Sequence, residues 1–345
     1  MALFVQDMIA LDPGSATTSV YVDGKGVCLR EPTAMLVSKE DSHQVAAIGE
    51  EAARLIGKHP EGIVSMPPVR DSAVTDTDLA ALLFLSLSEK ASGRKRPSEK
   101  GRLLVSAAPG LTPVEHAALT QAVRLTGAKR IAVVNSAIAG AIGADIDITK
   151  PNGVLWVDLG AGCAEVSVLS SCAVAATRTM RTGSMQFDET IVRYMRSAHG
   201  VSVSMRAAEE IKKCVGSAIE PPAGSGDTTR VYGRDLTTGK PVEVSVNARE
   251  IAGALRVCVD MIIGAIRDVL IRLPAEFSAD IRADGIHLSG GCSLLSGLTD
   301  AIAAATGLPV HRTQEPQDDV VNGLARIGRD ESLLHDLIAA GSAIE

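Results

Sequence analysis

The chain has 345 residues, a formal net charge of −7 and 46% apolar residues, but only one Trp, three Tyr and four Phe. This length predicts two domains of ordinary size, each able to bury its own core. A core built almost entirely from aliphatic side chains favours an α/β fold over an all-β sandwich. The acidic balance argues against a nucleic-acid partner, which would require a basic face.

The six cysteines indicate reduced thiols in a cytoplasmic protein, because they form no CxxC pair and no metal-type spacing. They are Cys28, Cys163, Cys172, Cys214, Cys258 and Cys292. No stretch reaches the ~20 apolar residues that span a bilayer. Residues 1–8 (MALFVQDM) have neither the basic region nor the cleavage site of a secretory signal, so we expect the protein to stay in the cytoplasm.

The chain opens on a strand, a tight polar turn and a second strand. Residues 8–11 (MIAL) are apolar, residues 12–18 (DPGSATT) contain a glycine and three hydroxyls, and residues 19–22 (SVYV) are again mainly apolar. The Asp-Gly pair at 23–24 predicts a hairpin turn. Loops and helix-like pieces follow, including an Ala/Leu-rich run at 78–87.

A second strand-and-helix region covers the middle of the first half. Residues 103–106 (LLVS) predict a buried strand. A helix is expected to begin after Thr112, where a proline follows and Glu115 is placed to complete a capping box. Residues 131–134 (IAVV) predict another strand, and residues 137–144 a helix of small side chains.

The opening pattern then returns. Residues 154–157 (VLWV) predict a strand, residues 158–164 (DLGAGCA) a glycine turn and residues 165–169 (EVSVL) an alternating strand. Asp158 lies 146 residues after Asp12, at the same place in the pattern. Solenoid repeats have periods of ~20–50 residues, so this spacing indicates duplication of a whole domain.

The rest of the chain adds helices and a third glycine turn. Helices are predicted at 209–217 and 248–273, and a terminal helix at 332–340. The strand predicted at 285–288 (GIHL) runs into residues 289–293 (SGGCS). A further helix is expected to follow this turn.

The three glycine turns are the candidate ligand-binding elements, because each emerges directly from a predicted strand. Glycines let backbone N–H groups approach phosphate oxygens, from which a Cβ would hold them away. The carboxylates of Asp12 and Asp158 cannot contact phosphate directly. At equivalent strand ends of two duplicated domains they would face each other across a cleft and hold Mg²⁺ through water. A single such turn is commonly only a turn, but the repetition favours a ligand site.

The ordered set DPGSATT, DLGAGCAE and LSGGCSLL resembles the first phosphate loop, second phosphate loop and adenosine loop of the superfamily of actin, sugar kinases and heat-shock chaperones. The sequence between these loops is similar to the MreB family of bacterial actin-like cell-shape proteins, from about residue 9 to about residue 328. The matching segments are 29–33, 46–49, 68–71, 127–128, 141–144, 187–189, 208–212 and 307–310.

The resemblance implies the actin-like ATPase superfold, in which two duplicated RNase H-like α/β domains enclose a nucleotide cleft. Domain I would comprise residues 1–150 and take back residues from about 312 to 345, and domain II would comprise residues 151–311. A sugar kinase is disfavoured, because the chain has no inserted domain to hold an acceptor hydroxyl.

The resemblance also implies which residues bind ATP. The first loop would act through Asp12, Gly14, Ser15, Ala16 and Thr17. The second loop would act through Gly160, Ala161 and Gly162, and the adenosine loop through Gly290, Gly291, Cys292 and Ser293. Glu209 and Lys212 would hold the ribose and adenine side, although the residues alone favour a solvated helix face for both. Mg²⁺ would be held by Asp12 and Asp158 through water.

The second phosphate loop departs from the family pattern. The family has DIGGGTTE, whereas this chain has Ala161 for a glycine and Cys163 and Ala164 for the two threonines. Two hydroxyl donors near the terminal phosphates are therefore absent. The adenosine loop has Cys292 in place of a glycine.

The catalytic region departs as well. The family's Glu-Glu-Pro is Asn135-Ser136-Ala137 here, so Asn135 is a degenerate catalytic position while Asp158 is retained. Loss of a general base can slow a reaction by ~10²–10⁴-fold. We expect ATP to bind and its hydrolysis to be slow or absent.

The resemblance implies a filament-forming protein that organises cell-wall synthesis and maintains cell shape. Its expected partners are other copies of itself, another MreB-type protein, the inner face of the cytoplasmic membrane and membrane proteins of cell-wall synthesis. The apolar residues 2–5 and the basic residues 94–96 are the features that would contact lipid. The alternative is a non-polymerising or co-polymerising actin-fold regulator of another MreB, which the altered loops favour.

Overall fold

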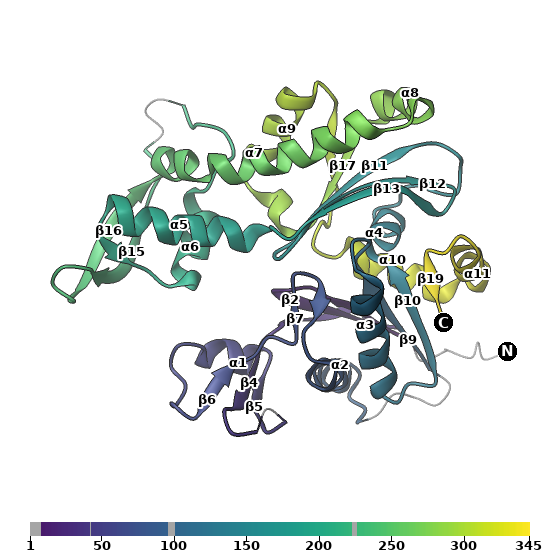
Figure 1. The fold of residues 1–345 in the computed structure, drawn as a ribbon, viewed down its shortest axis with the longest axis horizontal. Coiled ribbons are helices and arrows are strands. Elements are labelled where there is room, and N and C mark those ends of the chain that lie inside the picture. Colours follow the sequence, from purple (N-terminus) through teal and green to yellow (C-terminus); the bar gives the residue numbers. More distant parts are fainter. Residues whose placement is uncertain (1–7, 42, 96–100, 223–225) are drawn as a thin grey trace.

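The computed structural model describes residues 8–41, 43–95, 101–222 and 226–345, and it contains two central β-sheets surrounded by helices (Figure 1). The first sheet has the order β19-β10-β9-β1-β2-β3, and the second has the order β13-β12-β11-β17-β18. The strands of the first sheet are β1 (Met8–Pro13), β2 (Thr17–Val22), β3 (Gly26–Pro32), β9 (Arg102–Ala107), β10 (Arg130–Asn135) and β19 (Ala343–Ile344). Those of the second are β11 (Val154–Leu159), β12 (Ala164–Ser170), β13 (Ala173–Met180), β17 (Ile286–Ser289) and β18 (Val310–Arg312).

The two sheets repeat one pattern of pairing. β1, β2 and β3 form an antiparallel meander, and β9 and then β10 add to β1 in parallel. β11, β12 and β13 form the same meander, and β17 and β18 add in parallel. The duplication expected from the sequence repeat is therefore visible in the strand order. At its end the chain returns to the first sheet, where β19 pairs with β10.

Smaller sheets extend each half. These strands are β4 (Met35–Ser38), β5 (Val45–Ile48), β6 (Ile63–Ser65), β7 (Val69–Arg70), β8 (Ala73–Val74), β14 (Val201–Ser202), β15 (Thr228–Asp235) and β16 (Pro241–Asn247). The β7–β8 hairpin has a two-residue turn in which Asp71 and Ser72 both have positive φ, at 51° and 64°. This hairpin, which the sequence did not predict, reaches the cavity described below.

The helices cover the sheets. They are α1 (Glu50–Leu55), α2 (Thr77–Ser92), α3 (Pro113–Leu125), α4 (Ser136–Gly143), α5 (Ser184–Ala198), α6 (Met205–Val215), α7 (Ala248–Arg272), α8 (Ala275–Asp284), α9 (Leu298–Thr306), α10 (Asp319–Arg329) and α11 (Glu331–Ala339), with a short 3-10 helix η1 (Gly291–Leu294). The predicted capping box is present at α3, where the Thr112 backbone N–H donates to Glu115 Oε2 at 2.8 Å. None of the helices in the described ranges combines the length and apolar character that crossing a bilayer requires.

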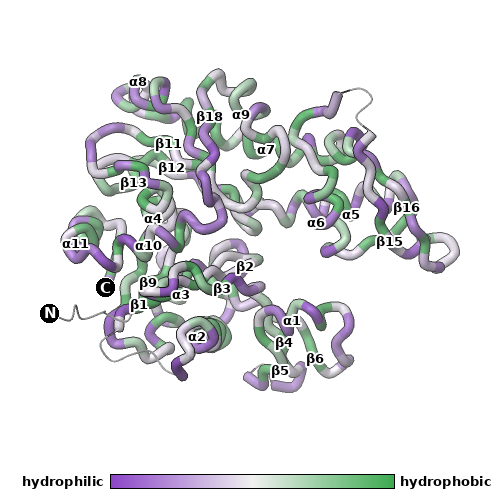
Figure 2. The backbone as a smooth tube through the Cα atoms, turned by 180° about the vertical axis from the view of Figure 1, so that it is seen from behind, coloured by the Kyte–Doolittle hydropathy of each residue, from purple (hydrophilic) through white to green (hydrophobic). Residues whose placement is uncertain are grey.

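The cores are aliphatic, as the composition predicts. Figure 2 shows hydrophobic residues along the central strands and hydrophilic residues on outer elements such as α8 and α11. The large exceptions are Trp156, Phe84 and Phe187, which are fully buried. Trp156 of the second sheet packs in one cluster with residues of α4 and α10 and with Leu104 of the first sheet. This cluster joins the two halves.

Glycines allow α4 and α10 to pack closely between the sheets. A Cβ on Gly323 of α10 would lie 1.7 Å from the backbone oxygen of Ala139, and one on Gly143 of α4 would lie 1.8 Å from the backbone oxygen of Asp319. A Cβ on Gly140 would lie 2.6 Å from the Trp156 ring. The backbones are thus in direct contact, and neither helix can take a larger residue at the crossing.

This contact yields a stability prediction. Gly323→Ala should destabilise the protein by about 1–3 kcal/mol or more, because overpacking forces the two helices apart. Gly253→Ala is the matched control, since Gly253 is exposed on α7 with nothing near its Cβ position, and it should stabilise by about 0.5–1 kcal/mol. Urea denaturation of both variants measures the difference. Equal stabilities would contradict the close crossing.

Candidate functional site

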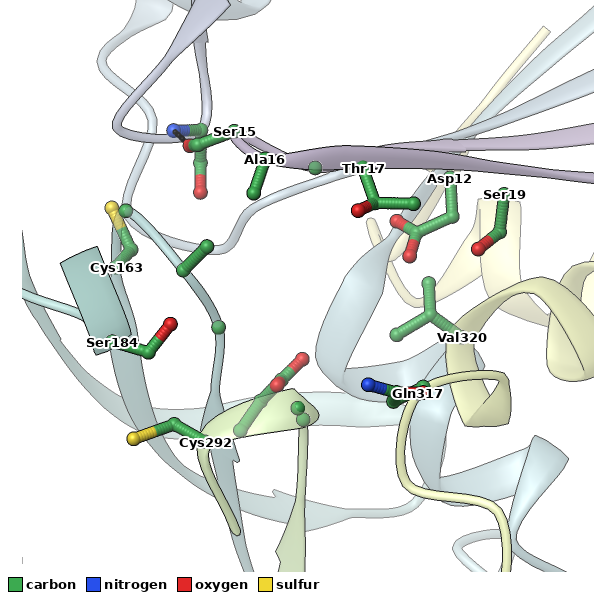
Figure 3. Close-up of a pocket in the computed structure, with 18 of the residues that line it drawn as sticks. Asp12, Ser15, Ala16, Thr17, Ser19, Cys163, Ser184, Cys292, Gln317 and Val320 are labelled. Atoms are coloured by element: carbon green, nitrogen blue, oxygen red, sulfur yellow. Dashed lines mark hydrogen bonds between the residues drawn. The ribbon is translucent and has the colours of Figure 1, made fainter. Parts of the chain in front are cut away.

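A cavity of about 790 Å³ lies between the two sheets, where β1, β11 and β17 end (Figure 3). The predicted site residues that line it are Asp12, Gly14, Ser15, Ala16, Thr17, Asp158, Gly160, Ala161, Gly162, Glu209, Lys212, Gly290, Gly291 and Cys292. Figure 3 shows Ser15, Ala16 and Thr17 on one side and Cys163 and Cys292 on the other. The structure therefore brings all three glycine turns to one cavity.

Two predicted residues do not line this cavity. Ser293 is buried, and its hydroxyl donates to the Gly290 backbone oxygen at 2.6 Å, so it holds the shape of the adenosine-loop turn. Asn135 caps α4, where its side-chain oxygen accepts from the backbone N–H of Ala137 at 3.0 Å. The next residue, Ser136, lines the cavity instead. The degenerate catalytic position predicted at Asn135 therefore lies next to the cavity, and its neighbour Ser136 lines it.

The glycines are required where the two halves meet. A Cβ on Gly162 would lie 2.4 Å from Ser15 Oγ, so the second phosphate loop approaches the first as closely as a glycine permits. Gly290 has a φ of 81°, and a Cβ there would lie 2.4 Å from an Asp158 carboxylate oxygen. A side chain at either position would therefore clash where these loops approach each other.

The β7–β8 hairpin closes the end of the cavity near the two phosphate loops. Ser15 Oγ accepts a hydrogen bond from the Ser72 backbone N–H at 3.1 Å. The buried Cys163 thiol is hydrogen-bonded to Ser72, and burial raises its pKa to about 11. Cys163 is therefore a neutral thiol in contact with the opposite half of the molecule.

Lys212 points inward and Glu209 does not. Lys212 Nζ lies 2.8 Å from an Asp188 carboxylate oxygen and donates to the Ser184 backbone oxygen at 3.2 Å. Its side chain is only 12% exposed, whereas that of Glu209 is 46% exposed and pairs with Lys213 at 2.6 Å. A helix face in contact with solvent, the alternative considered for both residues, therefore describes Glu209 in part but does not describe Lys212.

Three carboxyls line the cavity at neighbouring strand ends: Glu165 is buried, and Asp12 and Asp158 are half-buried. Asp12 accepts from Ser106 Oγ at 2.6 Å, and burial raises its pKa. Burial, with the nearby charge of Asp12, raises the pKa of Asp158 to about 7. Burial and the charge of Asp158 raise the pKa of Glu165 to about 8. All three residues line the same cavity.

Sequence reasoning did not single out Glu165, although the repeat contained a signal for it. Glu165 pairs with Asp158 across β11 and β12, as Ser19 pairs with Asp12 across β1 and β2. Both Ser19 and Glu165 line the cavity, and they are 146 residues apart. Aligning the repeat position by position would have found it. Other lining residues that were missed are Arg30, Ser136, Ser184 and Gln317.

In the described part of the chain, no group of three or more His, Cys, Asp or Glu side chains is placed to hold a metal ion directly. One carboxylate oxygen, Glu165 Oε1, is buried without a hydrogen-bond partner among the described residues. Such an oxygen calls for a donor, such as water, within the cavity.

The carboxyls predict that stability depends on pH. Glu165 and Asp158 have ordinary pKa values of 4.5 and 3.8, which the folded state raises to about 8 and about 7. The folded state then holds more protons, so the stability that these groups contribute is full at low pH and is lost as the pH rises through 7 and 8. The melting temperature of the nucleotide-free protein should fall as the pH rises from about 5 to about 8.5. Glu165→Gln should make this fall smaller, by roughly 2–4 °C for each kcal/mol of stability that the variant keeps at high pH.

The control for this prediction is Glu189→Gln, which alters an exposed carboxylate on α5 and should leave the pH dependence unchanged. A parallel change in both variants would contradict the assignment to the buried group. Calorimetry or fluorescence melting curves provide the measurement.

Comparison with known proteins identifies relatives over nearly the whole chain. A family model described as MreB/Mbl protein matches residues 6–335. The cell shape-determining protein Mbl of Bacillus subtilis (strain 168) is 32% identical over 321 residues, which cover 93% of this chain and 95% of that protein. The cell shape-determining protein MreB of Escherichia coli (strain K12) is 30% identical over 324 residues, which cover 93% and 92%.

Solved structures agree with this relationship. MreB5 of Spiroplasma citri bound to ADP matches with a TM-score of 0.88 and 26% identity, covering 97% of this chain and 99% of that chain. The same protein bound to AMPPNP matches with a TM-score of 0.87. A MamK double helical filament matches with a TM-score of 0.79 at 17% identity, which shows the fold alone. The expected actin-like fold is confirmed, and the chain belongs to the MreB/Mbl family of cell shape-determining proteins.

Proposed function

We propose that the cavity binds ATP with Mg²⁺ and that the protein is a nucleotide-dependent cytoskeletal filament. The observation that carries this proposal is the convergence of three glycine turns, from two duplicated sheets, on one cavity. The related MreB5 has been solved with ADP and with AMPPNP, which supports an adenine nucleotide as the ligand. The phosphates would meet the loops at Ser15–Thr17 and Gly160–Gly162. The base would lie between α6 and the turn at Gly290–Cys292.

Mg²⁺ would be held through water by Asp12 and Asp158, and it would supply positive charge between these carboxylates and the phosphates. The chain's own contribution is to fix both carboxyls at strand ends that face one cavity. Ser106 holds Asp12 by its 2.6 Å hydrogen bond. We further infer that the domains are 1–150 with 312–345, and 151–311, which the return of β19 to the first sheet supports.

A nucleotide that contacts both halves would stabilise the closed arrangement and so the conformer that assembles. Head-to-tail contacts between identical subunits are heterologous and extend into open filaments. Electron microscopy of purified protein with and without ATP tests it. Absence of filaments in both conditions would instead favour a non-polymerising regulator.

We also propose that the protein maintains cell shape and contacts the membrane. The first part is supported by its relatives, which are named cell shape-determining proteins. Residues 2–5 lie outside the described residues, as does Arg96 of the basic loop. Lys95 lies within them, just after α2. Co-sedimentation with anionic and with neutral vesicles tests membrane binding. Binding to neither would exclude direct lipid contact.

We expect slow ATP hydrolysis. Cys163 replaces a hydroxyl with a neutral thiol that is hydrogen-bonded to Ser72, and Ser136 offers no carboxylate at the position where the family has its second glutamate. Phosphate release should therefore be slower than that of an MreB with the usual DIGGGTTE and Glu-Glu-Pro segments. Equal rates under identical conditions would contradict this expectation.

The second phosphate loop provides a direct test of nucleotide binding. Gly162→Val should reduce ATP affinity at least ~10-fold, because its side chain would fill the approach to the phosphates and push against Ser15. Gly62→Val is the matched control, since Gly62 has open space around its Cβ position and does not line the cavity. Isothermal titration calorimetry with Mg²⁺ and ATP measures both. Unchanged affinity in Gly162→Val would contradict the proposed phosphate site.

A further inference from the structure

Arg30 brings a positive charge to the half of the cavity that carries the first phosphate loop. Among the described residues, three basic side chains line the cavity, namely Arg30, Lys212 and Lys213. The two lysines lie on α6 and pair with carboxylates of that half of the molecule. Arg30 lies on β3 in the first sheet. It is therefore the lining cation on the same sheet as Asp12.

The strand register places Arg30 on the cavity face of the first sheet. Asp12 of β1 lies opposite Ser19 of β2, and Ser19 lies opposite Arg30 of β3. Residues opposite each other on neighbouring strands point to the same face of a sheet. Figure 3 shows Asp12 and Ser19 directed into the cavity, and all three residues line it. Because the middle side chain, Ser19, is short, it leaves room for a ligand between Asp12 and Arg30.

Asp318 holds the guanidinium of Arg30 from one side. Arg30 Nε donates to Asp318 Oδ1 at 2.8 Å, and Nη2 donates to Oδ2. Asp318 is buried, whereas the Arg30 side chain is 47% exposed. The third nitrogen, Nη1, has no hydrogen-bond partner in the described part of the chain. A guanidinium fixed in this way presents its remaining N–H donors in a plane that suits a second anion, such as a phosphate.

The segment before α10 places this ion pair between the adenosine loop and the first phosphate loop. The Gly290 backbone N–H donates to the Pro316 backbone oxygen at 2.9 Å. A Cβ on Gly291 would lie 3.3 Å from the side-chain nitrogen of Gln317, which directly precedes the partner of Arg30. A nucleotide with its base at the adenosine loop and its terminal phosphate at the two phosphate loops would therefore pass Arg30 with its α- and β-phosphates.

We propose that Arg30 is a nucleotide-binding residue that donates from Nη1 to the α- or β-phosphate of the bound nucleotide. This inference rests on the proposed nucleotide site. The contact involves only phosphates that ADP and ATP share, so it holds the diphosphate part of the ligand and does not depend on the γ-phosphate. The charge of Arg30 also offsets part of the negative charge that Asp12 and the phosphates bring together.

Calorimetry of the full chain with Mg²⁺ and either ADP or ATP tests the contact. Arg30→Gln should lower the affinity for both nucleotides by a similar factor, at least ~10-fold, because a hydrogen bond between two charged groups is lost. Arg30→Lys keeps the charge but not the planar donors, so its loss of affinity should be smaller. A loss confined to ATP would place Arg30 at the γ-phosphate and overturn the proposal.

A double variant separates the phosphate contact from the ion pair. Arg30→Gln alone leaves the buried Asp318 carboxylate without its partner, which destabilises the fold by itself. Arg30→Gln combined with Asp318→Asn removes both charges together, and it should still bind ADP at least ~10-fold more weakly than the parent. Parent-like affinity in the double variant would overturn the proposal, because the loss in Arg30→Gln would then come from the broken ion pair.

The matched control is Arg178→Gln. Arg178 pairs with Asp268 at 2.7 Å, its side chain is 39% exposed, and it does not line the cavity. This variant should bind ADP and ATP as the parent does. Unchanged affinity for both nucleotides in Arg30→Gln would contradict the assignment of Arg30. Failure of the parent to take up either nucleotide would instead refute the proposed nucleotide site.

Discussion

The contact between α4 and α10 fixes how the two sheets face each other, and the cavity depends on it. Both helices lie between the sheets. Their backbones are in contact because Gly143 and Gly323 have no side chains. Trp156 of the second sheet packs against Gly140 in the same cluster. With the crossing fixed, the strand ends at Asp12 and Asp158 reach the same space. A small change at the crossing would therefore be transmitted to both phosphate loops.

The charge of the lining residues bears on the proposed role of Mg²⁺. Burial, and to a smaller extent the charge of a neighbouring carboxyl, raises the pKa of both Asp158 and Glu165. The basic side chains that line it, Arg30, Lys212 and Lys213, are each already paired with a carboxylate of the chain. A triphosphate entering alone would add negative charge to this site. Mg²⁺ held by Asp12 and Asp158 would supply the positive charge that offsets this addition.

Much of the fold follows from patterns that local chemistry controls. The strand and helix positions follow from apolar runs, and the Thr112–Glu115 capping box was evident from residue types alone. The repeat placed Asp12 and Asp158 at equivalent strand ends, which backbone pairing then fixes. Side-chain direction was harder to predict, because one residue of helical rotation decides whether Asn135 or Ser136 faces the cavity. The inward position of Lys212 depends on Asp188, a partner from another helix that no local pattern reveals.

The Cys163 thiol offers a view of motion between the two halves. Alkylating reagents attack the thiolate, and this thiol is buried, neutral at ordinary pH and held by Ser72 from the opposite half. Labelling there requires the halves to separate first, whereas the exposed Cys28 and Cys214 can react without any such movement. The rate of modification at Cys163, followed separately from the other buried thiols (Cys172, Cys258 and Cys292), would thus report how often the two halves open.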